Sequence, residues 1–281
     1  MKNIIRNSKT SNAIKTADLR PVRSSPPEGS SGPRLRAGET SNGTASNGIN
    51  LRTKSILEAA IKEYIKSGDP VSSKDLTKKY KFGVKDATIR NELNFLTKEG
   101  FLAQLHTSGG RVPTDKGYQF FVEETVEDIF ASKKILSGRS NSALMGGLRK
   151  GNLRDLVEAF SEGTKLLGVG QGEKEIYKSG LEELFSQLDM ETKEEMHEII
   201  HDFDRLDERL HEINQKIFSV IKEPRVFIGN KSPITQSKHL SVIMDSYSIG
   251  DHKVLIAIIG PKRMDYDKNL KLFKLFHEYD E

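Results

Sequence analysis

Apolar residues recur at helical spacing once the chain leaves its first fifty residues. Within residues 51–66 they fall three and four positions apart, which is typical of a helix with one buried face, and the segment 68–70, Gly-Asp-Pro, ends that pattern. Ser72 and Asp75 have the spacing of a capping box, in which each side chain bonds the backbone amide of the other residue. They predict a second helix that ends near Tyr80.

A third helix is predicted over residues 86–99, with Gly100 available for the left-handed residue that closes it. Its inner face is apolar and comprises Ile89, Leu93 and Leu96. Its outer face carries small, amide and basic side chains: Ala87, Thr88, Asn91 and Asn94, with Arg90 on the flank. Such side chains suit close approach to base edges, because Asn can make a bidentate contact with adenine and Arg with guanine. The alternative is an ordinary solvated helix face.

A short hairpin is predicted after this helix. Residues 101–105 alternate as a strand, Ser-Gly-Gly at 108–110 forms a tight turn, and Arg111 and Val112 begin the returning strand. Arg111 therefore lies beside a glycine tip whose backbone amides can touch phosphates. Thr114 is placed to cap a fourth helix. This order of helices and hairpin is typical of a winged helix-turn-helix domain, which binds DNA.

Several strings in the chain match a known family. Ala-Thr-Ile-Arg-Asn at 87–91, His-Thr-Ser at 106–108 and Pro-Thr-Asp-Lys-Gly-Tyr at 113–118 match the DNA-binding domain of the heat-inducible transcription repressor family HrcA. Ile-Gly-Pro-Lys-Arg-Met-Asp-Tyr at 259–266 is similar to the C-terminal signature of the same family. Chance does not readily place two unrelated signatures in the right order at opposite ends of a chain, so the chain resembles HrcA.

The resemblance implies a dimeric transcriptional repressor that binds an inverted-repeat operator in double-stranded DNA, with one winged head on each half-site. It also implies operators before chaperone genes, control by heat, and the chaperonin as a further partner. We expect neither an enzyme nor a cofactor. The residues predicted to contact DNA are Ser73, Lys74, Lys85, Thr88, Arg90, Asn91, Asn94, His106, Thr107, Ser108 and Arg111.

The chain departs from the family pattern at the DNA-binding elements. Lys85 and Asp86 stand where the family usually has serines, so we expect Asp86 to cap the third helix. Leu105 replaces a usual proline and Gly109 a usual alanine, which loosens the wing. The region between the two signatures is also shorter than the family's usual sensor domain, which resembles a GAF fold with an inserted segment.

The C-terminal half predicts a sheet with helices on it. Residues 225–228, 240–244 and 253–259 are predicted strands, and the last is almost wholly apolar and therefore central. Residues 270–276 form a closing helix. The expected fold class is α+β: an N-terminal winged helix-turn-helix domain followed by a shortened GAF-like α/β regulatory domain with a long amphipathic helix.

That long helix is predicted over residues 192–222, with Thr192 and Glu195 as a capping box at its start. Apolar residues recur in it with alternating steps of three and four, the spacing of a heptad seam: Met196, Ile199, Phe203, Leu206, Leu210, Ile213, Ile217 and Val220. The seam either pairs with a second subunit or packs on this domain's own sheet, and the pattern fits both.

Charge is distributed unevenly along the 281 residues. Residues 1–50 carry a formal charge of +5, residues 51–122 carry +5 and residues 123–281 carry −6, which gives the net charge of +4. A basic half joined to an acidic remainder fits a phosphate-binding head on a body that does not bind DNA. The chain has no cysteine, which excludes disulfides and thiol catalysis and fits a cytoplasmic protein. It has no apolar run long enough for a membrane span.

Composition divides the chain into four parts. Residues 1–50 are rich in Ser, Asn, Gly and Pro and are predicted to be a disordered basic tail, the alternative being an arm that follows the DNA backbone. Residues 51–130 form the winged-helix domain, residues 131–152 a linker rich in Ser, Gly and Asn, and residues 153–281 the GAF-like regulatory and dimerisation domain.

Three motifs point to other functions. His197-Glu-Ile-Ile-His201 has the HExxH pattern of zinc peptidases, but its two histidines fall outside the seam, on the solvent side, and the continuation that would supply a third ligand is absent. The glycines of segment 168–172 are misplaced for a nucleotide-binding loop and predict a flexible turn. Lys262 and Arg263 suggest either a phosphate site, an internal ion pair or a contact between subunits. The two alternatives to a repressor are thus a winged-helix regulator whose C-terminal domain senses a small ligand and, less favoured, a metallopeptidase.

Overall fold

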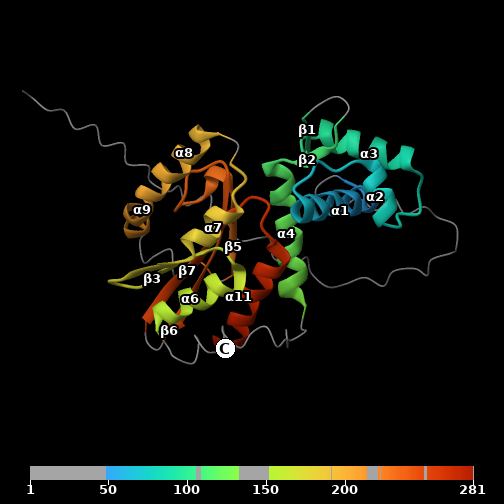
Figure 1. Cartoon of the computed structure of the whole chain (residues 1–281). Coiled ribbons are helices and arrows are strands. Elements are labelled where there is room, and N and C mark those ends of the chain that lie inside the picture. Colours follow the sequence, from blue (N-terminus) through green and yellow to red (C-terminus); the bar gives the residue numbers. More distant parts are fainter. Residues whose placement is uncertain are drawn as a thin grey trace, which may run out of the picture. The chain divides into compact units, whose positions relative to one another are not determined.

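The computed structural model describes residues 49–105, 109–132, 152–190, 192–213, 221, 223–249 and 252–280. These residues all belong to one compact unit, Ser41–Glu281. The fold is a mixed α+β fold, as predicted, with a helical head followed by a five-stranded sheet (Figure 1). The predicted tail, most of the predicted linker and the tip of the predicted wing lie outside the described residues.

Three helices open the head: α1 (Leu51–Ser67), α2 (Ser73–Lys79) and α3 (Asp86–Lys98). Asn50 caps α1 by accepting the amide of Thr53 at 2.9 Å. The predicted capping box of α2 is present, since the Ser72 hydroxyl accepts the Asp75 amide and the Asp75 carboxylate accepts the Ser72 amide. The first three helices therefore begin and end within a residue or two of their predicted bounds.

The cap of α3 differs from the prediction. Lys85 is the N-cap residue and no side chain caps the helix, whereas Asp86 is already helical. The Asp86 carboxylate instead accepts from the Arg90 guanidinium at 3.2 Å, one turn along the helix. The prediction that Asp86 supplies the cap is therefore wrong, because its side chain finds a partner on its own helix. Gly100 does adopt a left-handed φ of +78° at the end of α3, as predicted.

The predicted hairpin is present as β1 (Leu102–Gln104) and β2 (Arg111–Pro113), paired antiparallel with Gln104 opposite Arg111. Val71, at the start of the segment that leads to α2, joins them by exchanging two backbone hydrogen bonds with Arg111, at 2.9 and 2.8 Å. A Cβ added at Gly110 would lie 2.4 Å from the Pro70 carbonyl oxygen. Glycine is therefore required where the hairpin passes the α1–α2 connection.

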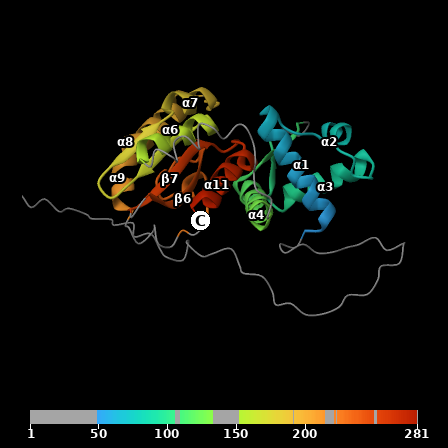
Figure 2. The same ribbon diagram turned by 90° about the horizontal axis from the view of Figure 1, so that it is seen from below.

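Helix α4 (Asp115–Ala131) connects the head to the rest of the molecule. Thr114 caps it by accepting the Gly117 amide at 3.1 Å, as predicted. Figure 1 and Figure 2 both show α4 between α1 and α11 (Tyr266–Asp280). One continuous apolar cluster accordingly joins the head to the sheet. The predicted domain boundary near residue 130 remains a prediction.

The five-stranded sheet is antiparallel at every pairing, in the order β4-β3-β7-β6-β5. Its strands are β3 (Leu167–Gln171), β4 (Ile176–Ser179), β5 (Arg225–Ile228), β6 (Leu240–Ile249) and β7 (His252–Pro261). The three predicted strands are confirmed, and the apolar one, β7, is central. Residues alternate along β7 between the two apolar clusters, so that Ile256 and Ile258 face one layer of helices and Leu255, Ala257 and Ile259 face the other.

Helices cover both faces of this sheet. Helices α6 (Leu153–Thr164) and α11 supply apolar residues to one cluster, and helices α7 (Leu181–Gln187) and α9 (Leu206–Glu212) supply them to the other. No helix among these described elements is both long and apolar enough to cross a membrane.

The prediction of a flexible turn at residues 168–172 is wrong. Residues 167–171 form strand β3, and all five are buried. A Cβ added at Gly170 would lie 2.3 Å from a methyl carbon of Val157 on α6. The glycines thus let α6 approach the strand closely, and this packing requirement, rather than flexibility, explains their number.

The prediction of one continuous helix over residues 192–222 is also wrong. The chain forms α8 (Lys193–Asp204) and α9, separated at Arg205. Asp202 is buried and accepts from Arg209 at 2.6 Å and from the backbone amides of Gln236 and Ser237 at 2.9 and 3.1 Å. This fixed carboxylate lies at the break, and the seam residues that follow it turn onto the chain's own sheet.

Several seam residues pack on the chain's own core. Leu206, Leu210 and Ile213 are buried in the cluster on one sheet face, whereas Met196, at the start of the seam, is 42% exposed. Ile217 and Val220 lie outside the described residues. The described second half of the seam therefore packs against this chain's own core, and pairing of the seam with a second subunit stays a prediction.

Candidate nucleic-acid interface

The outer face of α3 is open, as its sequence pattern predicts. Ile89, Leu93 and Leu96 are at most 1% exposed and hold the helix against α1 and α2. The residues on the other side are exposed, apart from the half-buried Thr88: Ala87, Arg90, Asn91 and Asn94. A rigid helix with buried anchors on one side and amides on the other can present those amides in a fixed geometry.

The hairpin adds a cation to this face. The Arg111 guanidinium at the start of β2 donates to the side-chain oxygen of Asn94 on α3. Burial lowers the pKa of Arg111 from its ordinary value, and the positive charge of Arg90 lowers it further. An arginine nevertheless stays protonated in proteins. Two guanidinium groups and an amide therefore lie close together where α3 meets the hairpin.

An anion would relieve the repulsion between these two arginines. The Nε atom of Arg111 is buried and has no hydrogen-bond partner among the described residues. Arg90 pairs with the half-buried carboxylate of Asp86, whose other oxygen, Oδ1, is buried and has no hydrogen-bond partner among the described residues. A phosphate supplies negative charge and hydrogen-bond acceptors for guanidinium groups, and the acceptor edge of a guanine supplies acceptors.

The remaining predicted contacts are placed as follows. Lys74 on α2 and Lys85 before α3 are exposed, which leaves their ammonium groups accessible. Ser73 is only 5% exposed, so it has little surface to offer a partner. His106, Thr107 and Ser108 lie outside the described residues. The assignment of all these side chains to DNA contact stays a prediction.

Two contacts at this interface join residues that lie far apart in the sequence. The bond from Arg111 to Asn94 joins residues 17 positions apart, and the pairing of Val71 with Arg111 joins residues still further apart. Neither leaves a local signal, because both depend on how the hairpin folds back over the helices. The geometry shows Asn94 as a partner of Arg111 as well as a candidate base reader.

The HExxH motif lies on α8, with His197, Glu198 and His201 all exposed, as predicted. Glu198 faces Lys238 at 3.4 Å and His239 at 3.8 Å, which are ordinary surface ion-pair distances. Among the described residues, no group of three or more His, Asp or Glu side chains is arranged to hold a metal ion.

The C-terminal signature at 259–266 forms internal contacts. Lys262 pairs with Asp115 at 2.6 Å and Arg263 with Asp189 at 2.5 Å. Tyr266 is fully buried, and its hydroxyl donates to the Lys262 carbonyl oxygen at 2.7 Å. Of the three possibilities that the sequence left open, the internal ion pair is the one present, although the acidic partners come from distant segments rather than from the neighbouring Asp265.

The fold and this interface define a mixed α+β protein whose helical head presents an open face of amides and arginines. Residues 131–270 match the family model described as HrcA protein C terminal domain. Proteins named heat-inducible transcription repressor HrcA match the chain at 43% identity over 112 residues in Rhodococcus erythropolis and at 51% over 78 residues in Natranaerobius thermophilus. The chain belongs to the HrcA family.

These matches are partial in length. The one from Rhodococcus erythropolis covers 40% of this chain and 30% of the relative, and the one from Natranaerobius thermophilus covers 28% and 23%. A solved structure described as a hypothetical protein at 2.2 Å resolution covers 82% of this chain and 97% of its own, with a TM-score of 0.62 and 16% identity. That likeness shows the fold alone, and it extends over both the head and the sheet.

Proposed function

We propose that this chain is a transcriptional repressor that binds a double-stranded DNA operator through a winged helix-turn-helix formed by α1–α3 and the hairpin. The observation that carries the proposal is the cluster of Arg90, Asn94 and Arg111, in which an arginine from the hairpin is bonded to the outer face of α3. In a winged helix that helix lies in the major groove, and the wing contacts the backbone beside it. The relatives' name, heat-inducible transcription repressor, agrees with this assignment.

The proposal includes a homodimer on an inverted repeat, because a two-fold protein places one head on each half-site of a palindrome. It includes operators before chaperone genes and the chaperonin as a further partner, as the family resemblance implies. The body is a shortened GAF-like regulatory domain, and the protein acts in the cytoplasm, where its operator lies. In this assignment it is not an enzyme and needs no cofactor.

A selection experiment with the full-length protein can identify its operator. Full-length protein is mixed with a pool of random duplexes, and the bound fragments are sequenced after successive rounds of selection. We expect an inverted repeat whose half-site centres are separated by about one helical turn, or a multiple of it. A selected site without two-fold symmetry would contradict the dimeric arrangement, and the absence of any enriched sequence would contradict sequence-specific repression.

A matched pair of variants then tests the proposed face. Arg90→Ala removes an exposed arginine that pairs one turn away on α3, and Arg154→Ala removes an exposed arginine in the same kind of pair on α6. We expect Arg90→Ala to weaken operator binding by about 1–3 kcal/mol, and Arg154→Ala to leave it unchanged. Equal effects of the two variants in a binding titration would refute the assignment of this face.

A further inference from the structure

The first turn of α4 is tied directly to the end of α3. The Thr114 hydroxyl donates to the carbonyl oxygens of Gly100 and Phe101, at 2.6 and 3.1 Å. The Lys116 ammonium donates to the Glu99 carbonyl oxygen at 2.7 Å and lies 4.1 Å from the centre of the Phe101 ring. These contacts satisfy carbonyl groups of the C-cap residue of α3 and of the two residues after it, so the first turn of α4 is bonded to the segment that ends α3.

Asp115 lies between Thr114 and Lys116 in the chain. Its side chain contacts the sheet domain rather than the end of α3. Its carboxylate accepts from the Lys262 ammonium at 2.6 Å. A Cβ added at Gly229, which follows β5, would lie 2.9 Å from the other oxygen of the same carboxylate. One side chain at the head's edge is therefore approached by two separate segments of the sheet domain.

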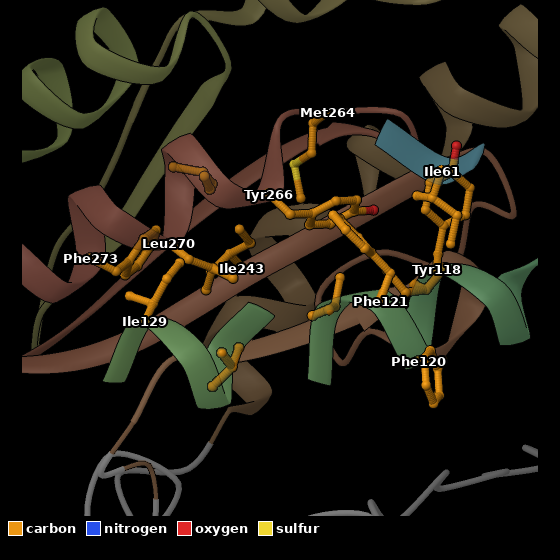
Figure 3. Close-up of a cluster of buried hydrophobic side chains, with 14 of the residues drawn as sticks. Ile61, Tyr118, Phe120, Phe121, Ile129, Ile243, Met264, Tyr266, Leu270 and Phe273 are labelled. Atoms are coloured by element: carbon orange, nitrogen blue, oxygen red, sulfur yellow. The ribbon is translucent and has the colours of Figure 1, made fainter. Parts of the chain in front are cut away.

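Aromatic side chains of α4 and α11 also pack together close to the Asp115–Lys262 ion pair. Tyr118 and Phe121 of α4 lie against Tyr266 of α11, with ring centres 6.0 and 6.5 Å apart, and Figure 3 shows these three side chains pointing toward one another. Because the Tyr266 hydroxyl also donates to the Lys262 carbonyl oxygen, the backbone that carries Lys262 is fixed to this aromatic cluster. The ammonium of Lys262 reaches Asp115 from an anchored position.

The aromatic side chains at this contact are more deeply buried than the ion pair. Tyr266 and Tyr118 are at most 3% exposed, whereas the side chains of Asp115 and Lys262 are 42% and 30% exposed. A cavity of about 250 Å³ adjoins the ion pair, and its lining includes Pro113, Tyr118, Pro261 and Lys262. Lys262 therefore borders open space, whereas the aromatic side chains beside it are closely packed.

We propose that the Asp115–Lys262 ion pair is a positioning contact through which the sheet domain sets the orientation and order of the recognition helix α3. The inference rests on the proposed function for the role of α3, and it adds the point at which the body can regulate it. Lys262 forms an ion pair with Asp115. The neighbours of Asp115, Thr114 and Lys116, bond the segment that ends α3 and begins the hairpin, so the contacts are continuous. Anything that separates Lys262 from Asp115 loosens the head without unfolding the core.

The C-terminal end of α4 is bonded to α11, independently of the Asp115–Lys262 ion pair. The ammonium of Lys274 on α11 is buried and donates to the Ile129 carbonyl oxygen at 2.8 Å and to the Ser132 carbonyl oxygen. A cation at the last carbonyls of a helix is stabilising. The C-terminal end of α4 is therefore held by a buried ammonium group, whereas the polar contact of its first turn with the sheet domain is a part-exposed ion pair.

Amide hydrogen exchange tests the contact without DNA. Lys262→Gln and Asp115→Asn each break the pair, and Lys271→Gln removes the same charge from a pair with Asp267 that lies entirely within α11. We expect the first two variants to raise the exchange rates of the Phe101 and Tyr118 amides by about two- to five-fold, the scale of a part-exposed ion pair, and the third to leave them unchanged. The double variant Asp115→Asn/Lys262→Gln should exchange no faster than either single variant.

Operator binding provides the second readout. On the operator selected by the wild-type protein, Lys262→Gln should lose about two- to five-fold in affinity while its binding to random duplex stays at the wild-type level. If no operator is selected, the proposed function fails, but the exchange experiment still decides on the contact. Wild-type exchange rates in Lys262→Gln and Asp115→Asn, or additive effects in the double variant, would overturn the positioning role.

Discussion

The hairpin places Arg111 where its side chain bonds Asn94 and is available for the proposed contact with a phosphate. Its guanidinium donates to Asn94 and lies close enough to Arg90 for the two charges to repel. The bond to Asn94 fixes the direction of a long side chain, which otherwise loses conformational entropy when it binds a phosphate. Asn94 in turn has part of its hydrogen-bonding capacity committed to Arg111, and so has less of it available for a base.

We therefore predict that substitutions of these two residues are coupled. Arg111→Ala should weaken operator and random duplex by similar factors and lower the slope of log affinity against log salt by about one unit, because it removes a phosphate contact. Asn94→Ala should have a smaller effect, and the double variant should depart from additivity by about 0.5–3 kcal/mol in salt-matched titrations.

The control for this cycle is Asn91, an exposed amide on the same face of α3. Asn91→Ala combined with Arg111→Ala should give additive losses. Additive losses for Asn94→Ala and Arg111→Ala as well would mean that the two side chains act independently on DNA. A loss confined to the operator in Arg111→Ala would make Arg111 a base reader.

At the scale of elements, the break between α8 and α9 separates two kinds of surface. Before the break, Met196 and Ile200 of α8 are each 42% exposed. After it, Leu206 and Leu210 are buried against the sheet, with Ile234 and Leu240 in the same cluster. The described second half of the seam is therefore buried, whereas in its first half Ile199 is buried and Met196 is exposed.

This division predicts different effects for two truncations within the same seam. Leu210→Ala should lower the free energy of unfolding by about 2–5 kcal/mol, because it leaves a cavity at a fully buried site. Met196→Ala should change it by less than about 0.5 kcal/mol. Urea denaturation measures both, and sedimentation at a fixed concentration shows whether either changes the oligomeric state. Dissociation of an oligomer by Met196→Ala would show that the seam pairs with a second subunit.

At the scale of the whole described unit, the head and the sheet share one core. Tyr118, Phe121 and Val122 of α4 and Phe273 of α11 belong to the same buried cluster as Ile61 of α1 and Ile258 of β7 (Figure 3). Separating the head from the body would expose these aromatic and aliphatic side chains to water. Each buried aromatic side chain contributes substantially to such a core, since large apolar residues give about 1.5–3 kcal/mol on burial.

We predict from this shared core that the head and the sheet unfold together. Native-state hydrogen exchange at increasing urea concentration should give the same free energy of opening for the buried amides of α1 and α4 and for those of β7. As a substitution control, Phe121→Ala should lower both values, because the ring lies between the two parts. Two separate transitions, with the head opening first, would show that α4 does not join them into one cooperative unit.

The sequence predicted those features of the fold that depend on near neighbours along the chain. Ser72 and Asp75 form their capping box because both partners lie within one helical turn, and Gly100 closes α3 because the left-handed conformation is easiest for glycine. The inner face of α3 followed from apolar periodicity, as burial confirms, and the central position of β7 followed from its apolar run, as the strand order confirms. The family resemblance carried by two short strings also holds.

Tertiary structure decided the features whose causes lie far apart in the chain. Gly168 and Gly170 lie in strand β3, where Val157 packs on them, and the helix breaks at Arg205 beside a carboxylate held by amides 34 and 35 positions away. Lys262 meets Asp115 across 147 positions, so its charge alone left its partner open. The sequence by itself determined the elements that depend on local backbone preference and periodicity, such as α1 to α3 and the apolar strand β7. The folded chain determined which polar groups meet, because a hydrogen bond or ion pair depends on the positions of both partners.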